Sequence, residues 1–252
     1  MGLAVSPNIR RISSYNAGMN LTAPLLLALL SQGAEVKSPP AVEEHSLLAN
    51  VKVGQVLNYS FSSTYEIGSA NAKFSSLVRM TIESYEAGKS VVIKNEQSKS
   101  TMSFQGKDVA SDNMVYTTTQ KVTGEFVSID PDPTPEQARF GNVMQMIVPS
   151  DKVKVGSKWN WTIKGTETTE GIGVKGNGEV LAFEEHMAVK CAKVKFVQME
   201  VGGERPSRGT LIAWISLVDG FAMEVQADYV SVPFLLGRSM PMKAVNKRIV
   251  AG

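Results

Sequence analysis

Apolar side chains alternate with polar ones over most of residues 50–232, and a period of two residues predicts β-strands. The alternation is clearest in seven segments: 74–86, 91–104, 114–129, 171–183, 189–201, 211–217 and 221–232. Between several of them lie pairs such as Gly202-Gly203 and Asp219-Gly220, which favour tight turns because glycine enters positive-φ conformations at little cost. We expect a mainly β protein, with roughly eight or nine strands in antiparallel sheet.

One sequence segment occurs twice. Residues 51–61 read VKVGQVLNYSF and residues 153–163 read VKVGSKWNWTI, so that the glycine, the asparagine and the alternating apolar positions coincide. This repeat predicts a turn that leads into a strand in each of two β halves, 50–133 and 149–237. Chance similarity between two amphipathic strands is the alternative to duplication.

A single helix is predicted between the two halves. Thr134 is suited to cap it, Pro135 to occupy its first turn, and Gln137 to complete a capping box with Thr134. One apolar stripe with helical spacing follows, made by Phe140, Val143, Met144 and Ile147. We expect an amphipathic helix within 134–148 that covers one face of the sheet or fills an opening in it.

The N-terminal residues resemble a secretory signal. Arg10 and Arg11 precede an apolar run at 19–30, and small residues follow it. Because a membrane span needs about 20 apolar residues, this run is too short to be one. We therefore expect residues 1–33 to be a signal peptide, and the mature protein to be periplasmic, extracellular or on the cell surface without a transmembrane segment. A helix packed on the domain is the alternative.

The segments that flank the two halves lack strong patterns. Residues 34–49 are predicted to be a polar linker. Residues 238–252 contain four basic side chains and no acidic one, and we expect a solvated basic tail. Contact of this tail with a protein partner or an anionic surface is the alternative.

Composition narrows the class of protein. With 43% hydrophobic residues and a net charge of +2, the chain is too apolar and too balanced in charge to be disordered. Without residues 1–33, 24 basic residues stand against 24 acidic ones, so we expect no nucleic-acid partner. The single cysteine, Cys191, cannot close an internal disulfide, and we expect a buried structural thiol.

Residues with catalytic or metal-binding chemistry are few. The two histidines, His45 and His186, have no second histidine at metal-ligand spacing, and we expect no metal and no cofactor. Residues 171–176 match the dinucleotide fingerprint G-x-G-x-x-G, but a strand pattern and not a helix follows them. We expect no enzymatic activity. An enzyme would have to rely on carboxylates such as Glu184, Glu185 or Asp228.

The spacing in the second half resembles a group of exported bacterial β-proteins. They combine a V-G-x-x-W strand start, here Val155 to Trp159, with a G-x-x-x-x-W hairpin, here Gly209 to Trp214 followed by Gly220-Phe221. These proteins are similar to the half-barrel lipoprotein-carrier (LolA/LolB-like) families. The resemblance implies a curved antiparallel sheet, here a duplicated half-barrel, that wraps a central helix and encloses an apolar cavity. Two features depart from those families: the duplication, and the lack of a lipobox cysteine.

These observations lead to one expected function and one alternative. We expect an exported, non-enzymatic protein that binds a lipid or another apolar small molecule between sheet and helix. Its expected cavity is lined by Trp159, Trp161, Trp214, Phe140, Met144 and Ile147. The alternative is a structural or interaction module of the cell envelope, with an envelope protein as partner, in which the same residues fill a core.

Overall fold

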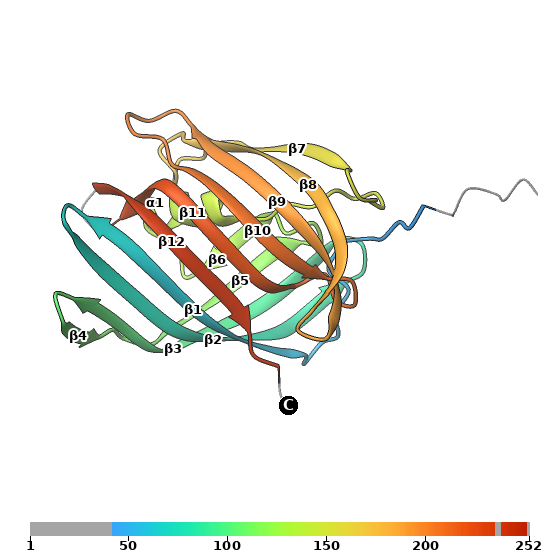
Figure 1. Ribbon diagram of the computed structural model, residues 1–252, viewed down its shortest axis with the longest axis horizontal. Helices are drawn as coiled ribbons and strands as arrows, with labels where there is room; N and C mark the ends of the chain where they lie inside the picture. The colour runs from blue at the N-terminus through green and yellow to red at the C-terminus, as the bar shows by residue number, and fades with distance from the viewer. Residues whose placement is uncertain (1–41, 235–237, 251–252) are drawn as a thin grey trace, which may run out of the picture. The chain divides into compact units, whose positions relative to one another are not determined.

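The computed structural model describes residues 42–234 and 238–250, and the expected signal peptide lies outside this range (Figure 1). The described residues form one sheet of twelve strands, in which every pair of neighbours is antiparallel. The strands of the first half are β1 (Val56–Ile67), β2 (Ala70–Glu86), β3 (Ser90–Phe104), β4 (Lys107–Ala110), β5 (Met114–Lys121) and β6 (Phe126–Asp130). The remaining strands are β7 (Lys158–Ile163), β8 (Gly173–His186), β9 (Val189–Val201), β10 (Arg208–Ser216), β11 (Ala222–Phe234) and β12 (Arg238–Arg248). The mainly β, antiparallel prediction is confirmed, with more strands than expected.

The C-terminal strand joins the two halves. Along the sheet the order is β6-β5-β3-β2-β1-β12-β11-β10-β9-β8-β7, so β12 pairs with β1 on one side and with β11 on the other. The expectation of a solvated tail is therefore wrong for residues 238–248. Met242 and Ala244 alternate with exposed Lys243 and Lys247, and the first two are buried in the core. The four basic residues of this segment suggested a solvated tail, although its apolar and polar residues alternate as in a strand.

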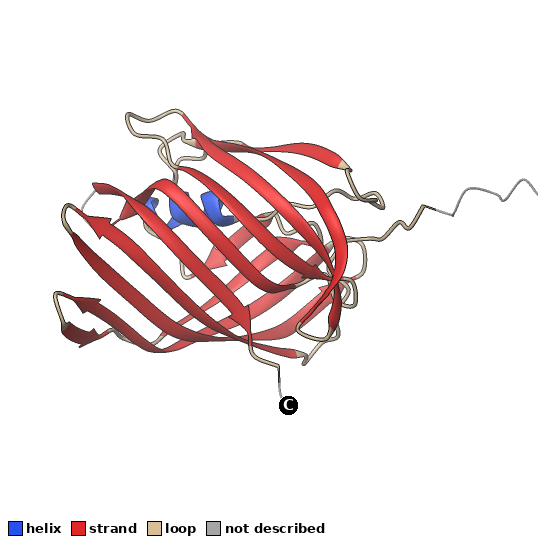
Figure 2. Ribbon diagram, in the orientation of Figure 1, coloured by secondary structure: helices blue, strands red, loops and turns tan. Residues whose placement is uncertain are grey.

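The sheet is curved, and a short helix lies on its concave side (Figure 2). This helix, α1 (Pro135–Met144), packs against β11, β8 and β9. The predicted capping box is present, because the Thr134 hydroxyl accepts from the amide of Gln137 and the Gln137 side chain accepts from the amide of Thr134.

The helix ends earlier than the sequence predicts. Gln145 has an extended backbone, and its side-chain oxygen accepts a 2.8 Å hydrogen bond from the amide of Phe126. The amide of Val148 then donates to the carbonyl of Thr123. Residues 145–148 thus pair with the turn between β5 and β6 instead of continuing the helix, and Ile147 lies beyond its end.

The two repeated segments form the same local turn. Gly54 and Gly156 have positive φ angles of 81° and 84°, and the amide of each donates to a carbonyl of the adjacent strand, at Ile82 and Val180. The strands that follow differ in position, because β1 lies inside the sheet and β7 ends it. Duplication of the two halves stays a prediction.

The last part of the predicted linker is packed onto the sheet. His45 and Val153 exchange two backbone hydrogen bonds of 2.9 and 2.8 Å. Leu47 and Ala49 are buried, with exposed fractions of 1% and 7%. Residues 45–49 therefore belong to the folded body.

Candidate functional site

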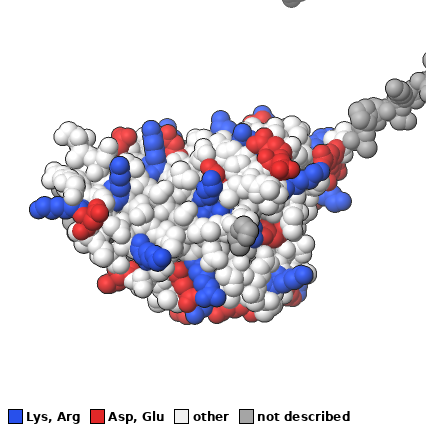
Figure 3. Space-filling view, turned by 60° about the horizontal axis from the view of Figure 1, so that its bottom comes forward, with Lys and Arg blue, Asp and Glu red and all other residues white. Residues whose placement is uncertain are grey.

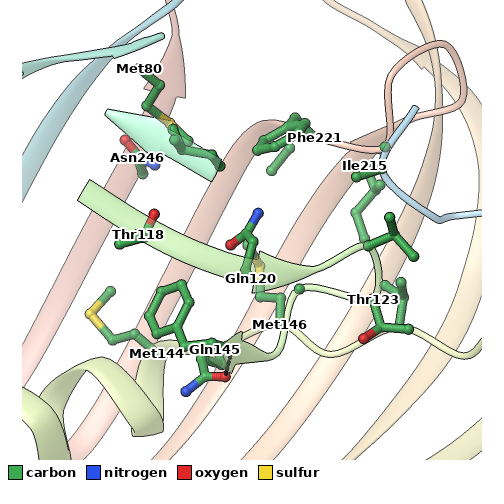
Figure 4. Close-up of a pocket in the computed structure, with 18 of the residues that line it drawn as sticks. Met80, Thr118, Gln120, Thr123, Met144, Gln145, Met146, Ile215, Phe221 and Asn246 are labelled. Carbon is green, nitrogen blue, oxygen red and sulfur yellow. Dashed lines mark hydrogen bonds between the residues drawn. The ribbon is translucent and has the colours of Figure 1, made fainter. Parts of the chain in front are cut away.

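Two adjoining cavities lie on the concave side of the sheet, and the first half supplies most of the residues that line them. The Gln120 cavity has a volume of about 270 Å³ and is drawn in Figure 4, and the Ser76 cavity has a volume of about 330 Å³. They share six wall residues: Tyr59, Met80, Asn95, Tyr116, Met144 and Asn246. Strands β1, β2, β3, β5 and β12 supply about half of the wall residues, and the end of α1 supplies Met144. Ile215, Phe221 and Ala222 of the second half also line the Gln120 cavity.

Flexible and aromatic side chains form the apolar part of the walls. Met80 approaches the Gln120 cavity from β2, whereas Met144 and Met146 approach it from the segment at the end of α1 (Figure 4). Phe126 lines the same cavity, and Phe140 lines the Ser76 cavity. Thioether side chains adapt to irregular shapes, so this wall can fit ligands of more than one outline.

Neutral polar side chains face the cavities from the strands. Ser76, Asn95 and Thr118 are buried, with exposed fractions of 4–5%. The amide nitrogen of Asn95 donates to the carbonyl of Ile93 (3.1 Å) and to the hydroxyl oxygen of Thr118 (3.3 Å). Within the described residues, the Ser76 hydroxyl has no hydrogen-bond partner.

The electrostatics of the cavities are those of an uncharged site. No described residue that lines either cavity is Lys, Arg, Asp, Glu or His. Burial raises the pKa of Tyr59 and the pKa of Tyr116, so both phenols stay neutral at ordinary pH. Basic and acidic side chains are instead interspersed over the outer surface seen in Figure 3.

Five of the six residues expected to line one cavity lie in or against the main core cluster. Phe140 and Met144 pack on that cluster and also line the cavities. Trp159, Trp161 and Ile147 belong to the cluster or pack against it, but they line neither cavity. The indole nitrogen of Trp159 donates to the carbonyl of Ile147 at 2.7 Å.

Glycines on β8 make room for the first two tryptophans. A Cβ atom at Gly178 would lie 2.2 Å from the Trp159 ring, and one at Gly176 would lie 2.2 Å from the Trp161 ring. Gly176, the last glycine of the pattern that resembles a dinucleotide fingerprint, and Gly178 just beyond it therefore allow close packing of β8 against the two indoles.

Trp214 lies in a different cluster, with Cys191 and Met223. Its ring stacks on that of His186 with the centroids 4.5 Å apart, and its indole nitrogen donates to Glu184 at 2.7 Å. The structure therefore does not bring Trp214 to the cavities of the first half.

The acidic residues beside Trp214 are held in their ionised form. The hydrogen bond from Trp214 lowers the pKa of Glu184. Burial acts to raise the pKa of Glu224, but hydrogen bonds from Gln226 and His186, with the nearby charge of Lys247, lower it overall. A carboxyl group that acts as a general acid near neutral pH needs a raised pKa. The pKa values of Glu184 and Glu224 are lowered instead.

The polar wall could have been predicted from the sequence, because polar residues interrupt the inward-facing apolar positions of two strands. On β3, Asn95 follows Val91 and Ile93 at the inward-facing positions, and all three are buried. On β5, Thr118 and Gln120 precede buried Val122 in the same register. Neutral polar residues that interrupt an inward apolar series on neighbouring strands indicate a polar interior surface.

The fold and the cavities define a mainly β protein with one curved antiparallel sheet and a partly apolar, uncharged interior site. In the described part of the chain, no helix has the length and apolar character that a membrane span requires. Comparison with protein-family models and with curated proteins finds no significant match.

Among solved structures, a protein from Bacteroides fragilis proposed to be exported, with a YmcC-like fold, is similar over 81% of this chain and 99% of its own. The sequences are 11% identical and the TM-score is 0.36. A likeness of this degree leaves function to be argued from the site itself. The resemblance to the half-barrel lipoprotein carriers stays a prediction.

Proposed function

We propose that the protein is exported, has no enzymatic activity, and binds a lipid-like small molecule between the concave face of the sheet and the end of α1. The signal-like pattern of residues 1–33 supports export. The observation that carries the binding proposal is the pair of cavities with six shared wall residues.

The size and lining of these cavities support a small-molecule ligand. Ligand sites usually have volumes of about 300–1,000 Å³, mostly apolar walls and a few polar groups. The two cavities have about 270 and 330 Å³, and Met144 lines both. Taken together, the two volumes fall within the usual range.

The binding proposal also moves the expected site. Trp159 and Trp161 pack on Gly178 and Gly176, and Trp214 lies in a separate cluster. Met80, Phe126 and Phe140, instead of the indoles, form part of the apolar wall of the two cavities.

Fluorescence of the neutral probe N-phenyl-1-naphthylamine tests the proposal on the purified full chain. We expect saturable enhancement, and we expect Met144→Trp to weaken probe affinity by at least about tenfold because the larger ring fills the shared wall. Met114→Trp is the matched control. Met114 is 44% exposed at the start of β5 and lines neither cavity, so affinity should stay unchanged.

Two results would overturn the proposal. One is the absence of saturable enhancement with the wild-type chain, which is what a filled-core structural module of the envelope predicts. The other is equal loss of affinity in Met144→Trp and Met114→Trp. Circular dichroism and thermal unfolding of each variant establish that the fold is retained.

A further inference from the structure

We infer that the ligand of these cavities is a neutral amphiphile: an acyl or similar apolar body whose polar end carries hydroxyl, ester or amide groups and no ionised group. The inference rests on the proposed function and narrows it to one chemical class. It excludes free fatty acids and phospholipids as the preferred ligands.

The first argument is the absence of a counter-charge. None of the described residues that line the Gln120 cavity or the Ser76 cavity is Lys, Arg, Asp, Glu or His. Arg248 and Asp219, whose charges act on Tyr59, are paired with each other at 2.8 Å. An ionised carboxylate or phosphate placed there would lose its hydration without gaining an ion pair, and burial of an unpaired charge is strongly unfavourable. A neutral polar end avoids this cost.

The second argument is the set of neutral hydrogen-bonding groups that are still free. The Ser76 hydroxyl is buried and has no partner among the described residues. The half-buried side-chain amides of Gln120 and Asn246, both at the Gln120 cavity, make no hydrogen bond within residues 42–234 and 238–250. Hydroxyls and amides both donate and accept, so together they match hydroxyl, ester or amide groups.

The third argument is that the open polar groups all lie on one side of the cavities. The free polar groups are those of Ser76 on β2, Gln120 on β5 and Asn246 on β12. Met144 and Met146, labelled with Gln120 and Asn246 in Figure 4, belong to the segment at the end of α1. On the α1 side, the buried side-chain amide of Gln145 already has partners. Its oxygen accepts from the backbone amide of Phe126, and its nitrogen donates to the side-chain oxygen of Asn142. A ligand between these walls meets all the open hydrogen-bonding groups on the sheet side, beside the thioether of Met80, and only the thioethers of Met144 and Met146 on the α1 side.

Competition between two ligands with the same acyl chain tests the inference. Monolaurin has a neutral glycerol ester at its polar end, and laurate has a carboxylate that is ionised at pH 8. Each is titrated, below its micelle-forming concentration, against the full chain loaded with N-phenyl-1-naphthylamine. We expect monolaurin to displace the probe at concentrations at least about tenfold lower than laurate, because only laurate must bury a charge.

A charge introduced at the cavity wall should reverse the preference. Gln120 is half-buried, so the ammonium group of Gln120→Lys can keep contact with water. We expect this variant to improve the displacement by laurate at least about tenfold relative to monolaurin, since the carboxylate gains a partner. Gln120→Met is the matched control, with similar length and no charge, and should bring no gain for laurate.

The outcomes separate this inference from the proposed function. If the wild-type chain does not bind the probe, the proposed function is wrong. If it binds the probe and laurate displaces it as well as monolaurin or better, the neutral-ligand inference is wrong while the binding proposal stands. The wild-type comparison decides the matter even if Gln120→Lys fails to fold.

Discussion

Replacing Arg139 with leucine should lower the free energy of unfolding by about 3 kcal/mol. The guanidinium group of Arg139, on α1, donates two hydrogen bonds of 2.9 Å to the two carboxylate oxygens of Glu200 on β9. The Glu200 side chain has no exposed surface, and that of Arg139 is 17% exposed. This pair ties the helix to the concave face of the sheet.

The magnitude follows from what remains after the substitution. Removal of one partner from a buried ion pair typically costs about 3–5 kcal/mol, because the other charge is left without compensation. Glu200 would keep one donor, the amide of Ser207 at 2.7 Å, which places the expected loss at the lower end. Glu200→Leu should cost less than Arg139→Leu, since the Arg139 side chain already reaches water.

Urea unfolding of the two single variants and of the double variant measures the coupling. Because leucine at both positions leaves no buried charge, the double variant should be more stable than the sum of the single losses predicts, by at least about 1 kcal/mol. A loss below about 1 kcal/mol for Arg139→Leu, or additivity of the two single losses, would refute the reasoning.

Three further predictions concern the second half of the sheet. Gly178→Ala should destabilise the protein by about 1–3 kcal/mol in urea unfolding, because its methyl group meets the Trp159 ring; unchanged stability would contradict this close contact. Burial raises the pKa of the Cys191 thiol to about 11, so native protein at pH 8 should react with iodoacetamide about a hundredfold more slowly than unfolded protein, and equal rates would show an accessible thiolate. The lowered pKa of Glu224 stabilises the fold above the ordinary value of 4.5, and this stability is lost as pH falls through the lowered pKa. Glu224→Gln should therefore lose stability at pH 7 and approach the wild type near pH 3; unfolding curves with the same pH dependence for both proteins would contradict this.

Strand content and the start of the helix could be predicted from local pattern. Alternation of side chains located the long strands, and the capping box formed by Thr134 and Gln137 located the first turn of α1. Both depend on residues close in sequence. The end of α1 depends on a distant contact, because the Gln145 side chain accepts from the amide of Phe126.

The central position of β12 and the place of the cavities could not be predicted in the same way. Strand order depends on pairing between residues far apart in the chain, such as Tyr59 with Arg248. The cavities depend on which inward positions leave space. Trp159 and Trp161 fill the space beside β8 because glycines there let them approach, whereas smaller residues such as Ser76 leave space in the first half.

Native mass spectrometry of the protein purified from the cells that produce it tests the central claim most directly. We predict a species heavier than the polypeptide by the mass of one uncharged amphiphile, released on activation and missing from Met144→Trp. Polypeptide mass alone in every preparation, or an added mass that persists unchanged in Met144→Trp, would contradict a ligand site between the sheet and α1.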